Sequence, residues 1–68
     1  MNAKITAAVE RFSMRARTGF LVIGTLADDP AHEFGEYDSL REARRVWFGH
    51  DDQDGPVFIF DAAGNNVA

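Results

Sequence analysis

The stretch GHDDQDGPVFIFD, residues 49–61, contains the densest group of residues able to bind a metal ion. Counted from His50, Asp52 and Asp54 occupy the third and fifth positions of a calcium loop. Histidine replaces the first carboxylate, however, and Asp61 stands where such a loop has a bidentate glutamate. The VFIF run indicates a strand where the exit helix should begin. We therefore expect an acidic loop that holds neither calcium nor zinc.

Other arrangements that could support catalysis are incomplete. His32 and His50 lack the HxH or HxxxH spacing that brings two metal ligands together. Ser13 falls in an alternating pattern and Ser39 in a helix cap, so neither is placed as an activated nucleophile. No glycine-rich phosphate loop occurs, and the absence of cysteine excludes thiolate chemistry. The sequence predicts a protein without enzyme activity, metal or cofactor.

The distribution of charge favours a binding function instead. The net charge of −4 divides into +3 for residues 1–20 and −7 for residues 21–68. The acidic residues fall in two expected turns and one short strand. The predicted acidic surface consists of Asp28, Asp29, Glu33, Glu36, Asp38, Asp51, Asp52 and Asp54. We expect this surface to bind a basic surface of another protein. The attraction between the two surfaces should weaken as the salt concentration rises.

In its strongest form, this interaction would let carboxylates imitate nucleic-acid phosphates and block a nucleic-acid-binding groove. The chain is similar in size and charge to small, acidic, cysteine-free phage-encoded inhibitors, anti-CRISPR proteins included. The similarity implies an inhibitor of a nucleic-acid-binding complex, acting as a DNA mimic. It does not extend to a shared sequence motif.

The arginines support an alternative, direct binding of nucleic acid. The candidate basic residues are Arg11, Arg15, Arg17, Arg41, Arg44 and Arg45. The last three share an expected helix face with Phe48, where they can hold phosphate while the ring stacks. A solvated face that pairs with Glu42 and neighbouring acids is the favoured structural explanation. In a third possibility, the basic and acidic halves of two copies pair head to tail, so we expect a monomer or a weak homodimer.

Hydrophobic spacing defines the N-terminal elements. Apolar residues at i, i+3, i+4 and i+7 predict a helix over residues 3–12, with Asn2 as its cap. The helix face consists of Ile5, Ala8, Val9 and Phe12. Residues 11–17 then alternate between apolar and polar side chains, which predicts a half-buried strand. Both patterns include Phe12, so the boundary between helix and strand stays open.

The remaining elements follow from strand composition and capping signals. Phe20–Leu26 is the best strand and is expected at the centre of the sheet. A turn over residues 27–31 leads to a shorter strand, residues 32–37. Ser39 and Glu42 match a capping box, which predicts a helix over residues 40–48 with Leu40, Ala43, Val46 and Trp47 as its apolar face. Residues 57–60 form the last strand.

These elements predict an α+β fold in the order α-β-β-β-α-β. We expect a two-layer sandwich, in which one or two helices cover one face of a mainly antiparallel sheet of three to four strands. The last strand returns after a helix, so pairing in parallel with one neighbour is also considered. With 68 residues, 46% of them hydrophobic, the chain should form one small folded domain over residues 1–68.

The expected compartment is the cytoplasm. The N-terminus lacks the apolar run of a signal peptide, and the chain contains no cysteine. The longest apolar run, residues 20–23, is too short to span a bilayer, so no membrane contact is expected.

Overall fold

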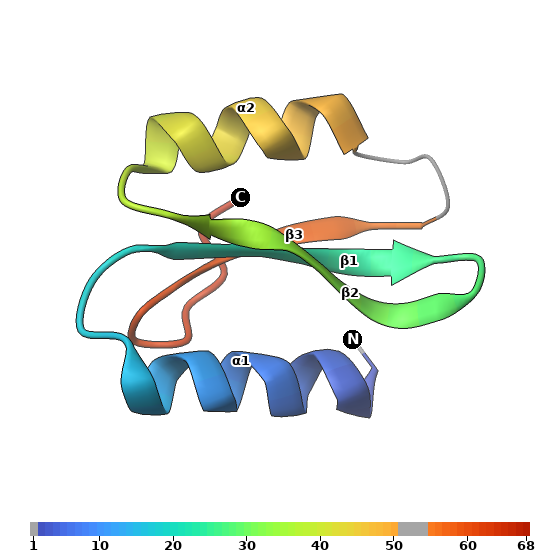
Figure 1. Ribbon diagram of the computed structural model, residues 1–68, viewed down its shortest axis with the longest axis horizontal. Helices are drawn as coiled ribbons and strands as arrows, with labels where there is room; N and C mark the ends of the chain where they lie inside the picture. Colours follow the sequence, from blue (N-terminus) through green and yellow to red (C-terminus); the bar gives the residue numbers. More distant parts are fainter. Residues whose placement is uncertain (1, 51–54) are drawn as a thin grey trace.

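Within residues 2–50 and 55–68, the computed structural model contains two helices and a three-stranded antiparallel sheet (Figure 1). The elements in chain order are α1 (Ala3–Arg15), β1 (Phe20–Leu26), β2 (Asp29–Tyr37), α2 (Leu40–His50) and β3 (Val57–Asp61). The strand order is β2-β1-β3, so β1 is central. The α+β class, the antiparallel sheet and the central position of residues 20–26 are confirmed.

The two helices lie on opposite faces of the sheet, which makes three layers and corrects the expected two (Figure 1). Side chains alternate along β1, so Leu21 and Ile23 point to the face covered by α1, while Val22 points to the face covered by α2. All three are completely buried. The unbroken apolar run in β1 therefore fills two cores at once, as in sheets covered on both sides.

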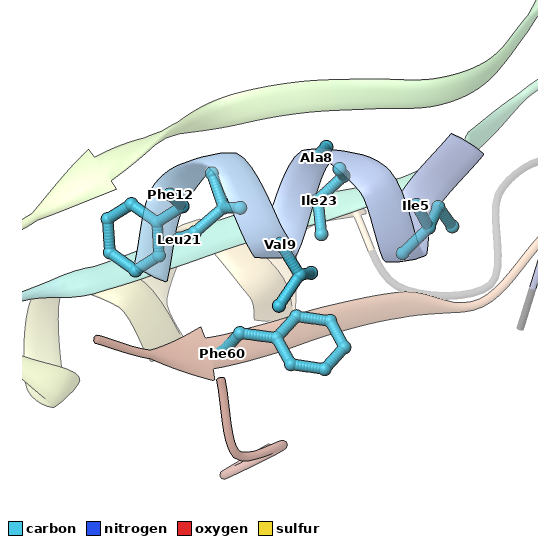
Figure 2. Close-up of a cluster of buried hydrophobic side chains, with 7 residues drawn as sticks. All are labelled: Ile5, Ala8, Val9, Phe12, Leu21, Ile23 and Phe60. Atoms are coloured by element: carbon cyan, nitrogen blue, oxygen red, sulfur yellow. The ribbon is translucent and has the colours of Figure 1, made fainter. Parts of the chain in front are cut away.

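The α1 core matches the predicted helix face residue for residue. Figure 2 shows α1 laid along the sheet, with its apolar side chains toward those of β1 and β3. The buried residues of this cluster are Ile5, Ala8, Val9, Phe12, Leu21, Ile23 and Phe60. Asn2 caps the helix as predicted, because its Oδ1 accepts a hydrogen bond from the amide of Ile5 (2.8 Å).

Residues 11–17 do not form the predicted strand. The helix α1 continues to Arg15, and Ala16 closes it by donating its amide to the carbonyl oxygen of Phe12 (2.8 Å). Of the alternating apolar positions, Phe12 is buried as part of the helix face, whereas Met14 is 88% exposed, so the two-residue pattern does not follow the core. The chain then turns at Gly19, whose φ of 97° is a left-handed conformation suited to glycine. With one strand fewer, the element order is α-β-β-α-β.

The strand β2 begins earlier than predicted, at Asp29, and pairs with β1 across a two-residue turn. Two register shifts interrupt the pairing, one between Val22 and Ile23 and the other between Gly24 and Leu26 of β1. Pro30 lies in this strand, which is acceptable at the edge of a sheet because its missing N–H is not needed for pairing with the centre.

The strand β3 pairs antiparallel with β1, so the parallel pairing considered for it is not found. The reason is the connection: β2 and β3 flank β1, and α2 carries the chain across the sheet between them. Gly24 permits close approach here, since a Cβ at this position would lie 2.9 Å from the carbonyl oxygen of Pro56. The outer edge of β3 is covered by the C-terminal segment, where the amide of Val67 donates to the carbonyl oxygen of Ile59 (2.8 Å).

Helix α2 begins where the capping signal predicts it and ends slightly later, at His50. The amide of Glu42 donates to Ser39 Oγ (3.2 Å). Ala43 is fully buried, and Leu40, Val46 and Trp47 are partly buried against the cluster that contains Val22. This confirms the predicted apolar face.

Trp47 links α2 to the sheet by two kinds of contact. Its indole Nε1 donates a hydrogen bond of 2.7 Å to the carbonyl oxygen of Val57 in β3, in addition to packing in the α2 core. The ring packs with the cluster of Val22, whereas Phe58 packs on the α1 side of the sheet. One side chain thus supplies both apolar burial and a directional contact.

We predict that Trp47→Ala lowers the free energy of unfolding by about 3 kcal/mol or more, because it removes a large packed ring and leaves a polar carbonyl without its partner. Trp47→Phe should cost less, since most of the packing is kept. Thermal unfolding measures both. Phe48→Ala is the matched control, because Phe48 is 81% exposed and its loss should shift the melting temperature little. A Trp47→Ala protein as stable as this control would refute the assigned packing.

Candidate functional site

The outward surface of α2 carries a cluster of basic and aromatic side chains. We call it the arginine face; it consists of Arg41, Arg44, Arg45 and Phe48. These residues are separated by three or four positions, so they share one side of the helix. That side is opposite the residues packed on the sheet, and all four are exposed. Together with Gly49 they line a shallow hollow.

Phe48 is the aromatic residue of this face, and its ring contacts the neighbouring Trp47. Its ring contacts that of Trp47 in a T-shaped arrangement, with ring centroids 6.0 Å apart and an interplanar angle of 77°. Trp47 is itself fixed by its hydrogen bond to Val57. Phe48 is therefore a large apolar side chain that is exposed to solvent. It contacts Trp47, which is itself fixed by its hydrogen bond to Val57.

The arginine face is not neutralised by carboxylates in the part of the chain that the structure describes. Within residues 2–50 and 55–68, the side chains of Arg41, Arg44 and Arg45 form no ion pair and no hydrogen bond with one another or with any other residue. The pairing with Glu42 that the sequence favoured is not formed. Three guanidinium groups, each with five donors, thus face solvent around one aromatic ring.

Acidic side chains collect along β2, the edge strand, and at its two ends. We call this group the acidic edge; its described members are Asp28, Asp29, Glu33, Glu36 and Asp38. The other three members of the predicted acidic surface, Asp51, Asp52 and Asp54, lie outside the described residues, as does the central part of the predicted acidic loop. That the acidic edge and this loop form one continuous acidic surface stays a prediction.

Two of the acidic-edge carboxylates have partners within the fold. Glu36 forms an ion pair with Arg15 of α1, whose Nη1 and Nη2 donate to its two carboxylate oxygens. The hydrogen bond from Arg15 lowers the pKa of Glu36, and the same bond raises the pKa of Arg15. Asp29 accepts from the amide of Ala31 (3.2 Å) and contacts His32 Nδ1 (3.1 Å). Contacts within the fold therefore offset part of the negative charge of the acidic edge.

The six arginines of the alternative basic site do not form one surface. Arg11 and Arg15 belong to α1 and Arg17 follows it, whereas Arg41, Arg44 and Arg45 belong to α2 on the opposite face of the sheet (Figure 1). Since residues 11–17 do not form the predicted strand, Arg11, Arg15 and Arg17 do not share a sheet face. Arg15 is also occupied by Glu36 and lies over the ring of Phe12, 5.6 Å from its centroid.

The fold brings the two histidines to one aromatic side chain, which their separation in the sequence concealed. The rings of Phe34 and His50 stack with centroids 4.6 Å apart, and His32 meets Phe34 edge-on at 4.8 Å. Within the described ranges, no three residues among histidine, aspartate and glutamate are placed to hold a metal ion. The contact joins the end of α2 to β2. No sequence signal pointed to it, since it depends on the path of the edge strand beneath α2.

An apolar groove beside α1 was also missed by the sequence analysis. It is lined mainly by Val9, Met14, Phe60 and Ala63, and Ser13 Oγ is buried beside it without a hydrogen-bond partner among the described residues. The turn that forms one wall is fixed by Asp61, whose Oδ1 accepts from the amides of Ala63 (3.0 Å) and Asn65 (2.9 Å). Backbone donation from Asn65 lowers the pKa of Asp61.

Comparison with protein-family models, with curated protein sequences and with solved structures finds no match to this chain. The geometry of its own side chains therefore carries the functional inference. Among the described residues, neither helix has the length and apolar character needed to cross a membrane.

We predict that Glu36→Gln lowers the melting temperature at neutral pH by roughly 1 to 5 °C, the range expected for an exposed ion pair in so small a domain. The pKa of Glu36 is lowered in the folded protein, so its contribution is present above the ordinary value of 4.5 and is lost as the pH falls through the folded-state pKa. The difference from the parent should therefore shrink as the pH falls through the folded-state pKa of Glu36 and vanish below it, as followed by thermal unfolding.

Glu33→Gln is the control, because Glu33 lies on the same strand and forms no hydrogen bond with Arg15. Combining Arg15→Ala with Glu36→Gln should cost less than the sum of the two single changes. Additive effects, or a Glu36→Gln difference that persists in acid, would show that the pair does not stabilise the fold.

Proposed function

We propose that this chain is a non-enzymatic nucleic-acid-binding domain whose contact surface is the arginine face of α2. The observation that carries the proposal is the grouping of three exposed arginines without described acidic partners around the exposed ring of Phe48. Guanidinium groups match phosphate oxygens with paired donors, and an exposed aromatic ring offers a surface to a base. The combination fits a polyanion that also carries aromatic groups.

The net charge of −4 does not oppose this proposal at short range. The acidic edge lies on β2, and the three arginines are concentrated on one side of one helix. Within a Debye length of about 8 Å at physiological salt, the local charge of the arginine face dominates the attraction. On α2 itself the three arginines outnumber the one carboxylate, Glu42, so this helix presents a net positive charge to phosphate. We extend the proposal to a cytoplasmic location, on the basis of the cysteine-free sequence.

The variant R41A/R44A/R45A should lose binding to a mixed-sequence oligonucleotide. The parent protein should bind at micromolar concentration at low salt, with an affinity that falls as salt rises, because contacts to phosphate release counterions. Mobility-shift titrations over a salt series measure the affinity and its slope. Each removed phosphate contact should reduce the magnitude of the logarithmic salt slope by about 1.

The matched control is K4A/R11A/R17A, which removes the same charge from exposed residues on or next to α1. It should bind nearly as the parent does, since the sheet separates α1 from the arginine face. Equal losses in the two triple variants would show that binding depends on overall charge alone. Failure of the parent to bind any oligonucleotide at low salt would refute the proposal.

The acidic edge supports a second candidate function, an interaction with a basic protein surface. Five acidic residues fall between positions 28 and 38, and Asp28 and Asp38 are exposed without a side-chain hydrogen bond to any residue of the described ranges. Such a surface attracts a basic partner and accelerates association. In its strongest form the carboxylates replace phosphates, and the domain acts as an inhibitor of a nucleic-acid-binding complex. Acidic residues also protect an edge strand from pairing with other chains, which requires no partner.

For this second function, the variant D28K/E33K/D38K should lose a partner that the parent captures from its native host, mainly through a slower association rate. These side chains are exposed, so the fold should be retained. The arginine variant R41A/R44A/R45A serves as the control and should still capture the same partner. Retention of that partner by the charge-reversed protein would exclude the acidic edge as its binding surface.

A further inference from the structure

We infer that the arginine face takes single-stranded nucleic acid, with one unpaired base stacked on the ring of Phe48. This inference rests on the proposed function and names its ligand class. The deciding residue is Phe48, because the arginines would hold the phosphates of a single strand or of a duplex alike. A phenyl ring adds the most affinity where a base offers its flat face.

The exposure of Phe48 leaves its ring available for stacking. Only about a fifth of the residue is covered, since it is 81% exposed, and its ring contact is the T-shaped one with Trp47. Most of the surface of Phe48 is therefore open to a ligand. Trp47 in turn is fixed by packing and by its bond to Val57, so the platform is partly ordered before any ligand binds. Order in the free protein reduces the entropy lost on binding.

The spacing along α2 suits a strand that follows the helix. Arg44 and Arg45 lie about one turn before Phe48, and Arg41 lies two turns before it, which places the first arginine about 11 Å along the axis from the ring. Phosphates on the N-terminal side and a base at the C-terminal side can therefore be bound at once. The nucleic-acid strand can continue past Arg41 without any further contact with the protein.

A duplex fits the same surface less well. Its internal bases are already stacked on each other, so Phe48 could reach a base face there only by unstacking one base step, which costs a few kcal/mol. Without that separation a duplex offers the phenyl ring only base edges and thymine methyl groups, which contact less of the ring than a stacked base does. Single strands pay no such penalty, because their bases are open to aromatic partners.

The test compares four labelled ligands of equal length by fluorescence anisotropy: a thymidine strand, the same strand with abasic sites, a mixed-sequence single strand and its duplex. Phe48→Ala should weaken binding of the two single strands by roughly 5- to 150-fold, the cost of one lost stacking contact. It should leave binding of the abasic strand and the duplex unchanged. Phe48→Trp should preserve single-strand binding, because indole also stacks.

Met14→Ala is the matched control, since Met14 is the other large hydrophobic side chain exposed among the described residues and lies on α1. It should bind every ligand as the parent does. Quenching of Trp47 fluorescence by the thymidine strand, and not by the abasic strand, gives an independent reading, because Trp47 is the only tryptophan and contacts Phe48. Melting temperatures confirm that Phe48→Ala is folded.

The outcomes separate the inference from the proposal on which it rests. If Phe48→Ala binds the single strands as well as the parent, or if the duplex binds as tightly as they do, the stacking inference is wrong. The nucleic-acid function would then stand as long as R41A/R44A/R45A loses binding. If the parent binds none of the four ligands at low salt, both are refuted.

Discussion

The fold depends on the burial of β1 from both sides. Leu21, Val22 and Ile23 are consecutive and completely buried, so neither face of the central strand can be left to solvent. A three-stranded sheet is too small to bury these side chains by itself, and each face requires its own helix. The placement of α1 and α2 on opposite sides follows from this requirement. It also divides the basic residues between two distant surfaces, which leaves the three arginines of α2 as a separate group.

The orientation of α2 about its own axis is set by a few contacts. Ala43 is buried where the helix meets the sheet closely, and Trp47 binds the carbonyl oxygen of Val57. These two contacts, one helical turn apart, fix which side of α2 faces outward. The arginine face is thus positioned by the same packing that stabilises the α2 core, since a rotation of the helix would require Trp47 to leave its partner.

Local patterns in the sequence predicted local structure well. The apolar face of α1, its cap at Asn2 and the start of α2 after Ser39 all follow from interactions within one helical turn, and all are found. The strand predicted over residues 11–17 failed because an alternation of six or seven residues also occurs by chance at the end of a helix. The choice between the two depends on whether Met14 has a core to face, which is a tertiary property.

The number of layers was in principle readable from the sequence. The runs FLVI and VFIF are continuous, whereas a sheet with one solvated face requires alternation. For the candidate site, helical spacing predicted that Arg41, Arg44, Arg45 and Phe48 share a face. It could not predict that Glu42 does not pair with these arginines or that Arg15 would meet Glu36, 21 residues away, because such contacts depend on the packing of whole elements.

The two edges of the sheet are protected in different ways against pairing with strands of other molecules. On one side, the C-terminal segment occupies the outer edge of β3 with backbone hydrogen bonds from Asp61 and Val67. On the other, β2 contains Pro30, two register shifts and a row of carboxylates. Neither edge offers a regular, uncharged backbone on which another strand could pair. Even at high concentration, addition of strands from other copies is therefore disfavoured, and partners are expected to meet the molecule through side chains.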